Sequence, residues 1–110
     1  MPDVCTWGNA AVIQILWEFV VKKENIEDFE RYYAASGAWA ALFAKSEKFR
    51  GTHLLRDTDN PGRFVTVDLW EDLGAFQTLR ALHAKDYEKL DRACETFTER
   101  EHCIGVFQVS

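Results

Sequence analysis

Apolar side chains recur in this chain with two periods, one typical of strands and the other typical of helices. Residues 11–21 (AVIQILWEFVV) carry apolar side chains on both alternating faces, which indicates a central strand covered on both sides. Residues 49–71 predict two strands joined by a tight turn, and residues 101–109 predict a last strand. The stretches 25–48 and 73–97 instead have apolar residues at helical spacing.

These stretches give the order strand, helix, strand, strand, helix, strand. With short right-handed connections, that order predicts an α+β fold: a ferredoxin-like four-stranded antiparallel sheet with helices on one face. We expect Asn25 to cap the start of the first helix. We also expect Gly37 to interrupt this helix, with a kink or a break into two short helices.

The turn between the second and third strands falls at Asp59-Asn60-Pro61-Gly62, where Pro61 and Gly62 suit the central positions of a type II turn. A loop of four residues or of two fits this sequence, and both give the same facing because side chains alternate along a strand. One predicted face is polar and aromatic: His53, Leu55, Asp57, Thr66, Asp68 and Trp70. The other is mainly aliphatic: Leu54, Arg56, Val65, Val67 and Leu69.

The aliphatic face has a consequence for assembly. Helices cover only one side of such a sheet, yet the first strand is apolar on both faces and the hairpin adds further aliphatic side chains. An apolar area of that size is rarely left in water. We therefore expect a second copy of the chain to cover it, which predicts a twofold homodimer.

Length and composition exclude several classes of protein. The 110 residues fit one domain, which we assign to residues 11–110, and residues 1–10 are expected to form a flexible N-terminal tail. A net charge of −5 without a basic cluster argues against nucleic acid and against a membrane surface as partners. No stretch approaches the ~20 apolar residues of a membrane span, and the start lacks the pattern of a secretory signal.

The cysteines point the same way. Cys5, Cys94 and Cys103 are odd in number and lack C-x-x-C spacing, which argues against a disulfide framework and against a zinc site. His102 and Cys103 are neighbours on a predicted strand, so they point to opposite faces and do not form a metal pair. We expect a cytoplasmic protein without a metal site.

Several motifs together resemble a known family. They are Gly37-Ala38-Trp39, Gly51-Thr52, Thr66-Val67-Asp68-Leu69-Trp70 and Gly105-Val106-Phe107. In this order they are similar to the antibiotic biosynthesis monooxygenase family of dimeric α+β barrels. The resemblance implies a cofactor-independent oxygenase that acts on a small aromatic molecule, and a tryptophan that looks into the pocket at the end of the third strand. Trp70 stands at that position.

The haem-degrading branch of the same superfamily is less similar. That branch uses an asparagine on the first strand and a histidine on the helix after the tryptophan. Here Gln14 is found on the first strand, Arg80 stands roughly where the histidine would be, and His83 follows three residues later. The resemblance therefore does not extend to haem, and we expect no cofactor.

Three residues are the candidates for chemistry. His53 or Asp68 would act as a base on a phenol or enol, and Trp70 would form a stacking wall. Structural roles compete with these: a satisfied histidine, an Asp68 paired with an arginine, and a tryptophan that only fills the core. The substrate-binding candidates, each with core packing or surface pairing as its alternative, are Trp39, Phe43, Arg56, His83 and Tyr87.

Two hypotheses about function follow. The first is a cofactor-independent monooxygenase-like protein acting on a planar phenolic or polyketide-like small molecule. The second is a non-catalytic homodimer of the same fold that binds a small ligand.

Overall fold

The computed structural model describes residues 12–108. Along the chain, the strand β1 is followed by a short 3-10 helix and two α-helices, then by a β-hairpin, two more helices and a last strand. The elements are β1 (Ile13–Val21), η1 (Lys23–Asn25), α2 (Ile26–Tyr33), α3 (Ala38–Phe43), β2 (Phe49–Arg56), β3 (Arg63–Trp70), α4 (Leu73–Leu82), α5 (Ala84–Cys94) and β4 (Thr98–Gln108).

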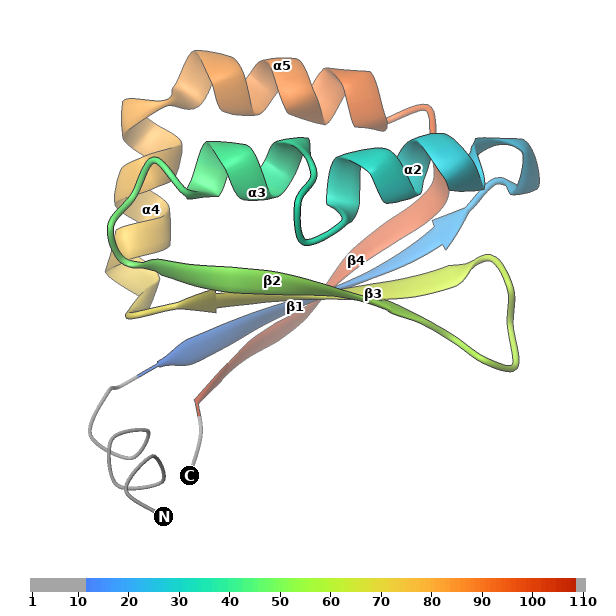
Figure 1. Ribbon diagram of the computed structural model, residues 1–110, viewed down its shortest axis with the longest axis horizontal. Coiled ribbons are helices and arrows are strands. Elements are labelled where there is room, and N and C mark those ends of the chain that lie inside the picture. The colour runs from blue at the N-terminus through green and yellow to red at the C-terminus, as the bar shows by residue number, and fades with distance from the viewer. Residues whose placement is uncertain (1–11, 109–110) are drawn as a thin grey trace.

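The four strands form one antiparallel sheet in the order β2-β3-β1-β4. All the helices lie on one side of this sheet, with α5 and α3 side by side above it and α4 at one end (Figure 1). This is the predicted α+β, ferredoxin-like arrangement. The prediction that the first strand is central is also confirmed, because β1 has a paired strand on each side.

The predicted break in the first helix is present and has a steric cause. A Cβ atom at Gly37 would lie 2.6 Å from the carbonyl oxygen of Tyr32, so only glycine fits where the chain turns between α2 and α3. Asn25 directly precedes α2, so the expected position of the helix start is confirmed, but the expected capping hydrogen bond is not made. The Asn25 side chain donates instead to the carbonyl oxygen of Thr96, which ties the start of α2 to the segment before β4.

The hairpin has a different register from the one predicted. Arg56 pairs with Phe64, and the backbone N–H of Asp57 donates to the carbonyl oxygen of Arg63, which leaves a loop of five residues, 58–62. Asp57 Oδ1 holds this loop by accepting from the backbone N–H of Asp59 at 2.8 Å and of Asn60 at 3.3 Å. Gly62 does not have a positive φ, so the predicted type II turn is wrong as well.

An odd number of loop residues reverses the facing of one strand relative to the other. Thr52 is paired with Asp68 and His53 with Val67, so the expectation that His53 and Asp68 share a face is wrong. Thr52 and Asp68 face the helices and are buried, whereas His53 is exposed on the opposite face. Leu54, predicted on the aliphatic face, also moves to the helix side, where it packs against the core.

The core fills the space between the sheet and the helices in two adjoining parts. One surrounds Trp70 and includes Trp39 and Phe43, while the other surrounds Phe29 and Phe64 beneath α2. Aromatic rings dominate both parts, which accounts for the 14% aromatic content of the chain.

Within residues 12–108, no helix has the length and the apolar character needed to cross a membrane. The predicted tail, residues 1–10, lies outside the described part of the chain.

Candidate functional site

A cavity lies between the sheet and the helices, on the side of the sheet that Figure 1 shows covered. Its free volume of about 60 Å3 has room for roughly four water molecules. Strands β1, β2, β3 and β4 and helices α2, α3, α4 and α5 all contribute to it. The lining residues are Trp17, Phe19, Tyr33, Trp39, Phe43, Thr52, Thr66, Asp68, Phe76, Tyr87, Asp91 and Glu101.

Asp68 is the buried carboxylate of this cavity. It lies on β3, where strand alternation turns it toward the helices, and only 8% of the residue is exposed. Burial disfavours the charged form and raises the pKa of Asp68 to about 6, although a hydrogen bond from Thr52 opposes the shift. A carboxyl group with such a pKa is mainly ionised at neutral pH and is strong enough as a base to accept a proton.

Two threonines flank Asp68 on the floor of the cavity. Thr52 Oγ1, on the neighbouring strand β2, donates a hydrogen bond of 2.6 Å to Asp68 Oδ1. Thr66, two residues before Asp68 on β3, is also buried. Among residues 12–108, Asp68 Oδ2 has no hydrogen-bond donor, so this oxygen is free to bind a ligand group.

Aromatic rings form the walls above this floor. Trp39 contacts Tyr87 edge to face, with 5.0 Å between ring centroids, and Tyr33 with 6.0 Å. Phe76 lies edge to face with Phe43 at 6.0 Å and with Tyr87 at 6.4 Å. Edge-to-face contacts of this kind hold the rings in fixed relative orientations, so the walls form a defined slot.

Charged groups surround the outer part of the cavity. Asp91 on α5 and Glu101 on β4 are both exposed, and partial burial followed by repulsion from Asp91 raises the pKa of Glu101. Burial also raises the pKa of Tyr87. The guanidinium of Arg80 opposes this shift and lies 4.7 Å from the centre of the Tyr87 ring.

Four of the eight residues singled out in the sequence line this cavity: Asp68, Trp39, Phe43 and Tyr87. They come from β3, α3 and α5 and meet because these helices pack over the same part of the sheet. The structure therefore brings together the buried carboxylate and three of the aromatic candidates.

Trp70 lies behind the wall of the cavity. It is 0% exposed and packs against Phe43, Phe49 and Phe76 at centroid distances of 5.1 to 5.6 Å. It is not a lining residue, so the expectation that Trp70 itself looks into the pocket is wrong. Its indole N–H has no hydrogen-bond partner within residues 12–108, and its position supports Phe43 and Phe76 from behind.

The other three candidates lie elsewhere. His53 is on the uncovered face of the sheet, for the reason given by the hairpin register. Arg56 forms a salt bridge of 2.9 Å with Glu30 at the edge of the sheet. His83 follows α4 and lines a separate surface hollow together with Lys45 and other residues.

The sequence reasoning missed two groups of lining residues. Thr52 was missed because its facing depended on the hairpin register, which a five-residue loop reversed. Asp57, which accepts hydrogen bonds from the next residues, was the available signal for that loop. Glu101 and Asp91 belong to no sequence motif that points to a site, and only the packing of β4 and α5 brings them to the cavity.

Residues 13–90 of the chain match the family model described as antibiotic biosynthesis monooxygenase. No curated protein matches the chain by sequence.

Several solved structures share the fold. SnoaB from Streptomyces nogalater, a cofactor-independent oxygenase, has 24% identity and a TM-score of 0.68 over 91% of this chain and 94% of its own. A Bordetella bronchiseptica protein assigned to the antibiotic biosynthesis monooxygenases has 20% identity and a TM-score of 0.74 over 91% and 98%. A conserved protein of Methanosarcina mazei has 11% identity and a TM-score of 0.73 over 96% and 99%. At these identities the likeness shows the fold.

Proposed function

Because this chain belongs to the antibiotic biosynthesis monooxygenase family, we propose that it is a cofactor-independent monooxygenase acting on a planar phenolic or polyketide-like small molecule. The observation that carries the proposal is Asp68, a buried carboxylate with a pKa of about 6 and a free oxygen atom in an aromatic cavity. An ordinary structural aspartate would be paired with a basic group, and Asp68 is in no salt bridge within residues 12–108.

The first step is removal of a proton. Asp68 Oδ2 takes the proton of a phenol, or of the carbon acid next to it, and becomes a neutral carboxylic acid. The electron pair stays on the organic molecule, which becomes an electron-rich anion. Thr52 keeps Asp68 Oδ1 in place during this step, so the proton is accepted at a fixed position.

Dioxygen is the co-reactant of the second step. The anion gives one electron to dioxygen, the resulting radical and superoxide join in a C–O bond, and the peroxide anion recovers the proton from Asp68. Loss of water from this hydroperoxide leaves a carbonyl group. One oxygen atom of dioxygen is then in the product and the other is in water, so atoms and electrons balance without a cofactor.

The aromatic walls supply position and dryness. Trp39, Tyr87 and Phe43 are among the aromatic residues that line the cavity, and Trp39 and Tyr87 contact each other edge to face. The free volume of about 60 Å3 is smaller than the about 150 Å3 that holds one benzene ring, so some side chains must shift when a planar molecule binds. Trp70 acts as a positioning residue, because it holds Phe43 from behind.

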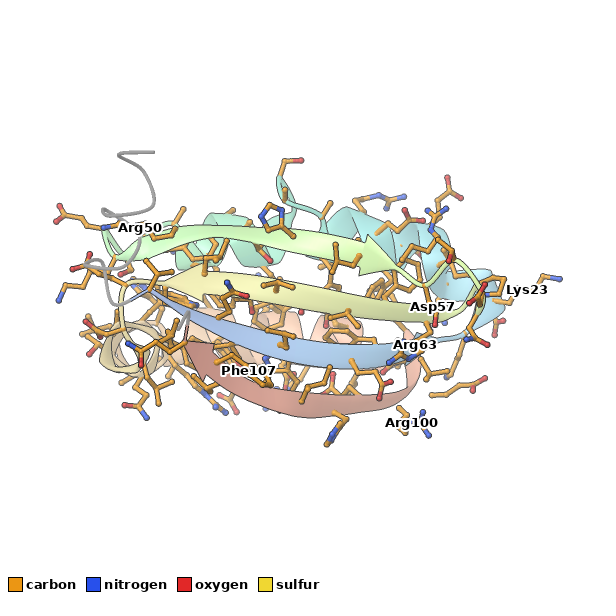
Figure 2. All side chains as sticks on the ribbon, turned by 90° about the horizontal axis from the view of Figure 1, so that it is seen from below. Lys23, Arg50, Asp57, Arg63, Arg100 and Phe107 are labelled. Carbon is orange, nitrogen blue, oxygen red and sulfur yellow. The ribbon has the colours of Figure 1, made fainter. Side chains whose placement is uncertain are left out.

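We also propose that the protein is a homodimer. The face of the sheet without helices carries aliphatic side chains of β1 and β3, and Figure 2 shows this face from outside. Leu16 is paired with Val67 and Glu18 with Val65, so the uncovered face is apolar in its centre. Phe107 on β4 is 48% exposed and Leu55 on β2 is 50% exposed. A second copy of this face would remove all five of these apolar side chains from water.

A binding role without turnover is the second candidate. It is favoured by one observation: no basic side chain lines the cavity to stabilise the anion that the first step creates. In that case Asp68 would serve only to bind a hydroxyl or amino group of the ligand.

Oxygen uptake separates the two candidates. The purified protein is incubated with a panel of anthrones and hydroquinones in air-saturated buffer containing a metal chelator. The enzyme proposal predicts protein-dependent oxygen consumption with at least one compound and incorporation of one atom of labelled dioxygen into the product. Binding of these compounds without any oxygen consumption would favour the second candidate instead.

A further inference from the structure

The charges around the cavity all have the same sign. Three carboxylates line it, Asp68 on the floor and Asp91 and Glu101 in the outer part, and among the described residues no lysine, arginine or histidine does. None of the three forms a salt bridge within residues 12–108. Some acidic side chains elsewhere are paired, as Glu18 is with Arg63.

The residues outside the described part of the chain offer no basic side chain that could pair with these carboxylates. Residues 1–11 and 109–110, which lie outside the described part, contain no lysine, arginine or histidine. Arg80 contacts the ring of Tyr87, but it is not a lining residue and lies in no salt bridge with the three carboxylates. The cavity is therefore an aromatic slot with an excess of negative charge.

All three carboxylates act electrostatically on Tyr87. Burial raises the pKa of the Tyr87 hydroxyl, Arg80 opposes this shift, and each of the three carboxylates adds to it by repelling the negative charge of a tyrosinate. The carboxylates come from β3, α5 and β4, and Asp91 also repels Glu101. Because the carboxylates line the cavity and Arg80 does not, an anionic ligand inside it would be repelled as well.

Aromatic rings next to carboxylates favour a positive ligand. The negative faces of tryptophan and tyrosine rings attract a cation, and this attraction grows when water is excluded. Trp17, Trp39, Tyr33 and Tyr87 all line the slot. Within residues 12–108 no three acidic, histidine or cysteine side chains are grouped closely enough to hold a metal ion, which makes an organic cation the better match.

We propose that the ligand of this cavity is a phenolic compound that carries a protonated amine, bound with its ring against the wall formed by Trp39 and Tyr87 and its ammonium group toward Asp91 and Glu101. This inference rests on the proposed function for the phenolic part only. The ligand would belong to the aryl-alkyl amines or to the amino-substituted phenols.

The same charge would assist the proposed reaction. Proton removal creates an organic anion in a cavity that Asp91 and Glu101 also line and that has no basic lining side chain among residues 12–108. An ammonium group on the ligand supplies the missing positive charge within the substrate itself. Phenols without such a group would be held less tightly and deprotonated less readily.

A matched series of three small phenols tests the proposal by binding alone. Tyramine, para-ethylphenol and para-hydroxyphenylpropionate differ mainly in the charge of the side chain: positive, absent and negative. Binding is measured by calorimetry and by quenching of tryptophan fluorescence under nitrogen at about pH 8, where the amine is still protonated. We expect tyramine to bind about tenfold more tightly than para-ethylphenol, and the anionic compound more weakly than both.

Variants locate the effect. Glu101→Gln should lower the preference for tyramine over para-ethylphenol several-fold. The double variant Glu101→Gln, Asp91→Asn should lower this preference further. Glu99→Gln is the control, because it removes the same charge from the same strand but does not line the cavity. Unchanged binding of para-ethylphenol by all the variants would show that the slot is still folded.

The outcomes separate this inference from the proposed function. Equal affinity for the three compounds, no measurable binding of tyramine, or an equal effect of Glu99→Gln and Glu101→Gln would overturn the amine proposal. Oxygen uptake with neutral phenols alone would overturn it while leaving the oxygenase intact. Selective binding of tyramine, with no oxygen uptake by any phenol, would support the amine and refute the oxygenase.

Discussion

Thr52 Oγ1 donates a hydrogen bond of 2.6 Å to Asp68 Oδ1, across the pair of strands β2 and β3. It is the hydrogen bond that stabilises the charged form of this buried carboxylate, and it opposes the effect of burial on the pKa of Asp68. Thr52→Val should therefore raise the pKa of Asp68 further above about 6. The acidic limb of the activity profile should move to higher pH by the same amount.

An NMR titration of the Asp68 carboxyl group measures this shift without relying on turnover. Thr66→Val is the matched control, because Thr66 is buried beside the same cavity but makes no hydrogen bond to Asp68. Equal shifts in the two variants, or no shift in Thr52→Val, would mean that the hydrogen bond does not control the carboxylate.

The raised pKa of Asp68 also predicts how stability depends on pH. Because the folded protein holds this proton up to about pH 6 while the unfolded chain releases it near pH 3.8, the stabilisation is present below pH 3.8 and is lost as pH rises through about 6. A difference of two pKa units corresponds to about 3 kcal/mol. Asp68→Asn should therefore unfold at a higher denaturant concentration than the native protein at pH 8.

This gain should disappear near pH 3, where Asp68 is mainly neutral in both states. The control is Asp91→Asn, an exposed carboxylate of the same cavity, for which we expect little change in unfolding at either pH. A stability difference between Asp68→Asn and the native protein that is the same at both pH values would rule out a buried charge as its cause.

Most of the fold was predictable from the sequence because it depends on patterns that are local. The apolar faces of β1 and the helical spacing before and after the hairpin are visible in the sequence, and so is the break at Gly37. The facing of β2 was not predictable, because a loop of five residues instead of four reverses it. Hydrogen bonds to Asp57 hold this loop.

The site was predictable only in part, for the same physical reason. Asp68 was identifiable as a carboxylate inside an apolar strand, and Trp39 and Tyr87 as aromatic residues on helices. Trp70 is separated from the cavity because the rings of Phe43 and Phe76 pack against it. The spacing of residues in the sequence does not predict this packing. Glu101 reaches the cavity through the packing of an edge strand, which is likewise a tertiary effect.

The five-residue loop makes its own prediction. Asp57 Oδ2 accepts from the side-chain amide of Asn60 and from Arg63, and Oδ1 accepts two backbone N–H groups of the loop. These hydrogen bonds, with that of the Asn60 side chain as the largest cause, lower the pKa of Asp57 to about 2. Asp57→Ala should lower the melting temperature by a few degrees. Asp57→Asn should lower it less, because the amide oxygen still accepts from the backbone of the loop.

Thermal unfolding followed by circular dichroism checks this order. At pH values below 2, where Asp57 is protonated, the native protein should lose its advantage over Asp57→Asn. If Asp57→Ala were as stable as Asp57→Asn, the side chain would not be what holds the loop.

Substitution on the uncovered sheet face tests the proposed dimer. Val67 lies in the centre of this face, opposite Leu16, so Val67→Lys would place a charge inside an apolar interface. Sedimentation at low micromolar concentration should show twice the chain mass for the native protein and a large monomer fraction for the variant. Gln77→Lys adds the same charge on the exposed side of α4 and should leave the dimer intact. A native protein that sediments as a monomer would contradict the proposal.

The central claim is that Asp68 is the base of a reaction with dioxygen, and oxygen uptake by Asp68→Asn tests it most directly. With a phenolic substrate found in the panel, at about pH 8, the account predicts at least a hundredfold loss of the rate in Asp68→Asn, because the base is removed while the fold and the hydrogen bond from Thr52 are kept. Glu99→Gln, which removes a carboxylate of β4 that does not line the cavity, should retain oxygen uptake. Oxygen uptake by Asp68→Asn at the native rate would show that Asp68 is not the base.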